Sequence, residues 1–116
     1  MRLYRPLLLS RVIFPGAFFR INNREKVLYL TFDDGPDPVS TQEVIDILAK
    51  YNVRAMFFLN GRNAEMYPHL ISAMKASGHV TGNHGYDHLD GWITSTRNYL
   101  SNVSSGASLS SEKWFR

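Results

Sequence analysis

The sequence predicts an α/β fold built on a parallel sheet. Two short, strongly apolar runs rich in β-forming residues, at residues 27–33 and 54–60, are separated by a stretch with the apolar spacing of a helix. A second helical stretch at residues 68–77 and a third extended run at residues 79–84 continue the alternation. Strand, helix, strand, helix, strand at this spacing is typical of βαβ units with right-handed crossovers, which produce parallel sheets.

The two apolar strands and the helix between them have clear sequence signals. Residues 27–33 and 54–60 are as hydrophobic as strands that are buried on both faces of a sheet. Between them, Ser40 and Glu43 form a capping-box pattern at a helix start, and Asn52 suits the left-handed residue that ends a helix. We therefore expect a helix from about residue 40 to residue 51.

The second half of the predicted fold follows the same logic. Pro68 suits the first turn of a helix and Gly78 its end, so a second helix is expected over residues 68–77. The run at residues 79–84 predicts a third, more polar strand. A last helix is outlined by four apolar residues at helical spacing: Tyr99, Leu100, Val103 and Ala107.

Size and composition limit the classes of protein that fit. The chain has 116 residues, of which 44% are apolar, so it can form one modest core. The net charge of +3 reflects a cluster of Lys and Arg within residues 1–26. No basic stripe interleaves with aromatic residues, so we expect no nucleic-acid partner. The absence of cysteine excludes disulfides and thiolate metal sites.

Residues 1–26 form a basic and apolar segment that we separate from a domain at residues 27–116. Arg11, Pro15 and Gly16 interrupt its apolar stretch, whereas a membrane-spanning helix needs about 20 continuous apolar residues. We expect no transmembrane span and find no clear signal peptide. The expected location is the cytoplasm or the cell envelope, and the oligomeric state stays open.

Polar side chains follow each predicted strand at its carboxyl end. Asp33 and Asp34 follow the first strand, Asn60 the second, and His84 and His88 the third. Ligand sites of parallel α/β folds gather at these strand ends. The sequence therefore predicts a functional site on this edge of the sheet.

The residue types at this edge favour a divalent metal. His84 and His88 are four residues apart in GNHGYDH, and two imidazoles with one carboxylate are a common ligand set for a catalytic ion. Taken alone, the His pair could be a surface feature and the Asp pair a turn with a helix cap. Two adjacent carboxylates repel each other unless a cation or a proton separates their roles, which favours the metal.

The two aspartates are expected to differ in role. Adjacent residues leaving a strand point in different directions, so one of Asp33 and Asp34 is free to act as a base when the other binds the metal. The spacing does not decide which. A phosphoryl-transfer or calcium site does not fit, since the regular ligand spacing of such loops is missing and Pro36 and Pro38 would disrupt one.

TFDDGPDP at residues 31–38 together with NHGYDH at residues 83–88 resembles the polysaccharide deacetylase family, also called the NodB-homology domain or carbohydrate esterase family four. The resemblance implies that Asp33 is the catalytic base and that Asp34, His84 and His88 bind one divalent ion, zinc first, with cobalt and nickel as alternatives. The implied reaction removes N-acetyl, or less often O-acetyl, groups from an acetylated polysaccharide, with Asp33 acting on water at the metal.

The resemblance also implies the architecture, a distorted (β/α) barrel of about 200 residues. This chain corresponds to about its first three βα units and stops before the fourth strand. The last three residues resemble the start of the third family motif, whose arginine orients the base, and this assigns Arg116 to the catalytic group. The family elements that follow this motif, including a histidine general acid, are not in the sequence. The resemblance thus implies an enzyme of this family with little or no activity in residues 1–116 alone, and the alternative is a truncated, inactive deacetylase that retains only the metal site.

Five further residues complete the expectations. Tyr86 and Trp92 flank the second motif and are candidates for stacking on a sugar ring. Gly85 departs from the family, which usually has Ser or Thr there to stabilise the loop between the histidines. His69 and His79 are expected to be structural, because they lie away from the predicted edge. 

Overall fold

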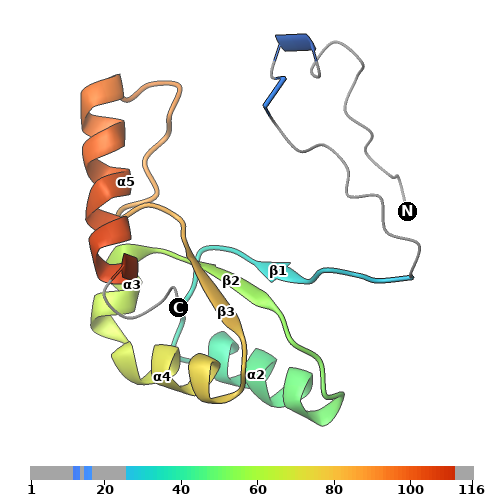
Figure 1. Cartoon of the computed structure of the whole chain (residues 1–116). Coiled ribbons are helices and arrows are strands. Elements are labelled where there is room, and N and C mark those ends of the chain that lie inside the picture. Colours follow the sequence, from blue (N-terminus) through green and yellow to red (C-terminus); the bar gives the residue numbers. More distant parts are fainter. Residues whose placement is uncertain (1–11, 14, 17–25, 112–116) are drawn as a thin grey trace.

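A three-stranded parallel sheet organises the described part of the chain (Figure 1). In this computed structural model, residues 12–13, 15–16 and 26–111 are described. Strands β1 (Thr31–Phe32), β2 (Met56–Leu59) and β3 (Val80–Asn83) lie in sequence order, so β2 is central. Met56 pairs with Thr31 on one side and with Val80 on the other. The predicted parallel α/β fold of three consecutive units is confirmed.

Within residues 26–111, four helices accompany the sheet: α2 (Ser40–Lys50), α3 (Gly61–Met66), α4 (Pro68–Ala76) and α5 (Thr96–Ser111). Helices α2 and α4 lie together beneath the sheet in Figure 1, and α5 stands against the carboxyl end of β3. The predicted helices at residues 40–51 and 68–77 are confirmed, as is the helix outlined from Tyr99 to Ala107. Helix α3 was not predicted. None of the helices in the described ranges is both long and apolar enough to cross a bilayer.

The core lies between β2 and the helices. Phe57 and Leu59 point into it and are 4% and 3% exposed, whereas Met56 and Phe58, on the other face of the strand, are half-buried. The residues that complete the core cluster come mainly from α2 and α4: Ile45, Leu48, Ala55, Ala64, Ile71 and Met74. The prediction that the strands are buried on both faces is therefore wrong for the described residues, since helices cover one face only.

Strand β1 is shorter than the sequence predicts. Residues 27–33 were expected to be strand, but pairing is confined to Thr31 and Phe32. The cause is the neighbouring strand, because β2 begins only at Met56, whose amide donates to the Leu30 carbonyl at 3.0 Å, and no strand pairing reaches the described residues before Leu30. Leu28 and Tyr29 are accordingly 75% and 69% exposed.

The start of α2 also differs from the prediction. Ser40 lies inside the helix, and the capping group is the Asp37 carboxylate, which accepts hydrogen bonds from the Val39 and Ser40 amides at 3.0 and 2.8 Å. Hydrogen bonds from Ser40, and then the bond from the Val39 amide, lower the pKa of the Asp37 carboxyl group. The capping box of Ser40 and Glu43 is therefore wrong. The predicted end is confirmed, since Asn52 has a φ of 52°.

Candidate metal centre

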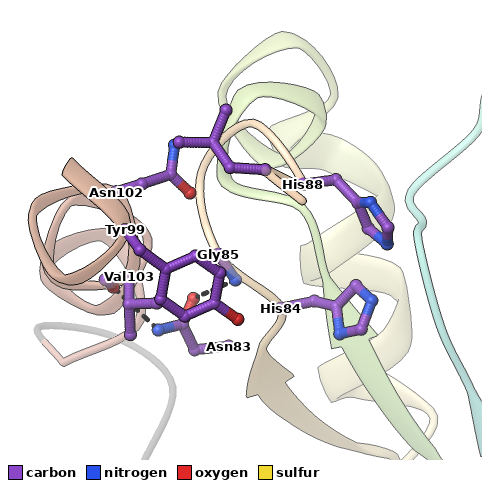
Figure 2. Close-up of a pocket in the computed structure, with 8 residues that line it drawn as sticks. Asn83, His84, Gly85, His88, Tyr99, Asn102 and Val103 are labelled. Atoms are coloured by element: carbon purple, nitrogen blue, oxygen red, sulfur yellow. Dashed lines mark hydrogen bonds between the residues drawn. The ribbon is translucent and has the colours of Figure 1, made fainter. Parts of the chain in front are cut away.

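Asp34, His84 and His88 converge at the carboxyl ends of the outer strands. The Asp34 Oδ1 atom lies 3.2 Å from His84 Nε2 and 3.1 Å from His88 Nε2. The two imidazole rings are 5.0 Å apart between centroids, and Figure 2 shows both pointing away from α5. His84 and His88, which lie 50 and 54 positions after Asp34 in the sequence, thus share one small volume with it.

The donor set fits a divalent cation. Bonds of about 2.0 to 2.2 Å in a tetrahedral arrangement place ligand atoms roughly 3.3 to 3.6 Å apart. The two Asp34–histidine distances are close to this range, and all three ligand atoms lie within 4.8 Å of one another. Two imidazoles and one carboxylate leave further coordination positions open, which is typical of a catalytic site. The residues present therefore fit a zinc-like ion.

Two of the three residues in this group have left-handed backbones. Asp34 has a φ of 72° and His88 a φ of 53°. Asp and His tolerate this region better than most residues, yet such conformations persist only where the surroundings hold them. The contacts that hold the two loops are therefore part of the site.

Helix α3 holds both loops at once. The Gly61 and Arg62 amides donate to the carbonyl oxygens of Gly85 and Tyr86, at 2.9 and 3.1 Å. On the other side, the side chain of Asn63 donates to the Asp34 carbonyl at 3.3 Å. Because α3 begins where central strand β2 ends, it connects the loops of the two outer strands.

The N-terminal cap of α3 explains why this short segment forms a helix. The Asn60 side chain accepts hydrogen bonds from the Arg62 and Asn63 amides, at 3.1 and 3.4 Å, and the Asn60 amide donates to Gly35 at 2.8 Å. Asparagine is among the best helix N-caps. Asn60 was predicted only as a polar residue of this edge, and its capping role was the signal that could have revealed α3.

Asp33 lies beside this group but does not join it. Its side chain is exposed, and no described residue donates a hydrogen bond to its carboxylate. Asp33 and Asp34 both line a cavity of about 220 Å³ between β1 and the start of α2. A second cavity, of about 230 Å³, lies on the histidine side and includes His84, His88 and Tyr99.

The two aromatic candidates have different surroundings. The Tyr86 hydroxyl donates to Glu65 at 2.8 Å, and Arg62 lies over the ring at 5.7 Å from its centroid. The bond to the Glu65 carboxylate raises the pKa of Tyr86, so this side chain is engaged by α3. Trp92 is 97% exposed and its ring is free to contact a ligand.

Of the remaining candidates, His69 and His79 lie away from the group. Arg116 lies outside the described residues. His69 is exposed on α4, with its ring against that of Tyr67. His79 is 7% exposed, and its Nδ1 atom accepts a hydrogen bond from the Ala55 amide at 3.3 Å. Burial first, and then the charge of Arg54, lower the pKa of His79.

Fold and site together define an α/β protein with a two-histidine, one-carboxylate group at the carboxyl ends of a parallel sheet. The family model for polysaccharide deacetylase matches residues 20–108. The chain belongs to the polysaccharide deacetylase family.

Named relatives and solved structures agree with this assignment. A peptidoglycan-N-acetylglucosamine deacetylase of Bacillus cereus is 33% identical over 112 residues, which are 95% of this chain and 52% of that protein. A chitooligosaccharide deacetylase of Sinorhizobium fredii is 52% identical over 63 residues, covering 54% of this chain and 29% of the relative. The structure of the peptidoglycan deacetylase PdaC from Bacillus subtilis matches with a TM-score of 0.70 at 32% identity, over 77% of this chain and 44% of PdaC. The chain thus spans about half the length of the first of these relatives, and less of the others.

Proposed function

We propose that this chain carries the metal centre and the base of a zinc-dependent deacetylase that removes N-acetyl groups from a polysaccharide. The convergence of Asp34, His84 and His88 carries the proposal, because their three ligand atoms lie within 4.8 Å of one another. Family membership supports the reaction class. Residues 27–116 would be the part of the deacetylase domain that holds these groups.

The roles of the residues follow from their positions. An ion held by Asp34, His84 and His88 would polarise the acetyl carbonyl and make nearby water more acidic. Asp33 is adjacent in sequence, exposed and free of hydrogen-bond donors among the described residues, so its carboxylate is available to accept a proton from that water. Arg116 is proposed, on the family resemblance alone, to orient Asp33.

The proposed substrate is a glycan that bears N-acetyl groups. The relatives named above are peptidoglycan and chitooligosaccharide deacetylases, and such substrates present a flat sugar face with an acetamide beside it. The free ring of Trp92 is suited to stack on a sugar face. The Tyr86 ring is held against α3, so a contact with sugar through its exposed part is the weaker of the two assignments.

The test measures zinc content and acetate release from N-acetylglucosamine oligomers by the same protein. The proposal expects one zinc ion per chain, and a weak acetate release that a chelator abolishes. The matched variant is Asp33→Asn, which should retain zinc and lose acetate release. Zinc binding without acetate release would assign only the metal site to this chain, and a chain that binds no zinc would contradict the proposal.

A further inference from the structure

The residue directly before His88 in the second motif is held by side chains from two helices. Asp87 follows Tyr86 in the loop that joins the two histidines. Arg62 of α3 reaches its carboxylate from one side, and Asn102 of α5 reaches it from the other. No motif predicted either partner, because they lie 25 and 15 residues away from Asp87 in the sequence.

Asn102 uses its whole side-chain amide on this loop. Its Oδ1 atom accepts hydrogen bonds from the backbone amides of Tyr86, at 2.9 Å, and of Asp87, at 3.3 Å. Its Nδ2 group donates to Asp87 Oδ2 at 3.3 Å. Three hydrogen bonds from one side chain define the position of the loop relative to α5.

Arg62 completes the arrangement from the opposite side. Its Nε group donates to Asp87 Oδ1 at 2.7 Å, and a second guanidinium nitrogen contacts the same oxygen. The Asp87 carboxylate raises the pKa of Arg62. The Arg62 side chain is 61% exposed, and exposed ion pairs contribute little to stability. Its main effect is therefore on the geometry of the loop.

Gly85 explains why Asn102 can approach so closely. A Cβ atom at position 85 would lie 3.0 Å from Asn102 Oδ1, and the φ of 78° at this residue disfavours any side chain. The glycine therefore leaves room for the Asn102 amide above the loop backbone. A side chain at position 85 would require the Asn102 amide to move by a few tenths of an ångström from its observed contacts.

We propose that Asp87, Arg62 and Asn102 form a positioning network that sets the His84–His88 loop for metal binding, in place of a side chain at position 85. The inference rests on the proposed metal site. These three residues do not touch the metal, and they act by fixing the loop conformation in which His84 and His88 meet Asp34. Asn102 is the principal member, since its side chain binds both the backbone amides and the Asp87 carboxylate of the loop.

The first test compares Asn102→Ala with Asn98→Ala. Asn98 is exposed on the same helix and its side chain makes no contact with the loop among those described. Zinc affinity is measured by competition with a chelator, and Asn102→Ala should weaken it by about 10-fold to 100-fold, as expected for a residue that orients metal ligands. Asn98→Ala should bind zinc like the wild type. Equal affinity of the two variants would overturn the inference.

A second readout needs no metal. In the metal-free chain, amide hydrogen exchange at Tyr86 and Asp87 should be slow in the wild type and in Asn98→Ala, and faster in Asn102→Ala. If the Tyr86 and Asp87 amides of the wild type exchange slowly but the wild type binds no zinc, the proposed function is wrong and the network is supported. Fast exchange of both amides in the wild type would contradict the network itself.

The third test exchanges the two side chains that face each other. Asp87→Asn places two amide groups in contact and Asn102→Asp places two carboxylates in contact, so each single variant should weaken zinc binding. The double variant restores one donor and one acceptor and should recover most of the affinity, a non-additivity that general destabilisation does not produce. Additive losses would contradict the network, and this comparison also decides the matter if Asn102→Ala does not fold.

Discussion

At the scale of single residues, the Asp33–Asp34 pair shows how one short motif yields two different environments. The sequence spacing indicated that only one of the pair would bind a metal but did not indicate which. The structure puts Asp34 with the histidines, where its left-handed backbone turns the chain after β1. Backbone conformation of this kind is set by contacts such as that from Asn63, which sequence spacing does not encode.

We predict that replacing Asp33 and replacing Asp34 have different effects on zinc binding and on acetate release. Asp34→Ala should abolish zinc binding, because it removes one of three ligands, whereas Asp33→Ala should bind zinc nearly as the wild type does and lose acetate release. Zinc content after dialysis checks the first outcome and an acetate assay the second. Equal loss of zinc in both variants would refute the assignment of roles.

His79 leads to a prediction about pH. Its pKa is lowered in the folded chain, so the unfolded chain takes up the proton first, and the stability it contributes is present above about pH 6.5. That contribution should fall as the pH drops below this value, since a protonated ring cannot accept the Ala55 hydrogen bond. Urea unfolding of the metal-free chain between pH 5 and 7 measures it.

The matched variant for this prediction is His79→Leu, which fills similar space and does not titrate. The free energy of unfolding should depend less on pH in His79→Leu than in the wild type. His69→Leu serves as the control, because His69 is exposed. Parallel pH profiles for the wild type and His79→Leu would contradict the account.

At the scale of elements, the sequence predicted those parts that have strong periodicity or clear ends. The pattern of α4, with Pro68 at its start and Gly78 after it, was sufficient to place it. Helix α3 was missed because it has only six residues and no repeating apolar face, so its one signal was the cap at Asn60. Strand β1 was drawn too long because hydrophobicity does not reveal where the neighbouring strand begins.

The packing of α5 against the loop that carries His84 and His88 also could not be predicted from the sequence. Asn83 donates to the Val103 carbonyl at 2.9 Å and accepts from the Gly85 amide at 2.9 Å, as the dashed lines in Figure 2 show. Gly106 allows this approach, because a Cβ atom there would lie 2.4 Å from Asn83 Oδ1 and 2.8 Å from the Gly85 backbone. A glycine within a helix would otherwise only weaken it.

We predict that Gly106→Ala destabilises the chain and weakens zinc binding. Alanine raises helix propensity by about 1 kcal/mol, yet overpacking at a close contact typically costs about 1 to 3 kcal/mol. The control is Ser104→Ala, an exposed change on the same helix. Urea unfolding and zinc titration of both variants check the prediction, and a more stable Gly106→Ala chain with unchanged zinc affinity would contradict it.

At the scale of the whole molecule, the order of the strands creates the site. The outer strands β1 and β3 flank β2, so the loops that follow them meet above the carboxyl end of the central strand, where α3 begins. The parallel sheet and the polar carboxyl edge were predictable from the alternation of elements. The half-exposed second face of the sheet was not, because strand hydrophobicity alone suggested burial on both sides.

The central claim is that Asp34, His84 and His88 together bind one divalent ion. X-ray absorption spectroscopy of the zinc-loaded chain tests it most directly, because it counts the imidazoles around the metal and measures their distances. We predict one zinc ion per chain with two imidazole nitrogens at about 2.0 to 2.1 Å and carboxylate oxygen at about 2.0 to 2.2 Å. His84→Ala should remove one imidazole from the spectrum or abolish binding, whereas His69→Ala should change nothing. A zinc ion with fewer than two imidazole ligands in the wild type, or a spectrum unaltered by His84→Ala, would contradict the claim.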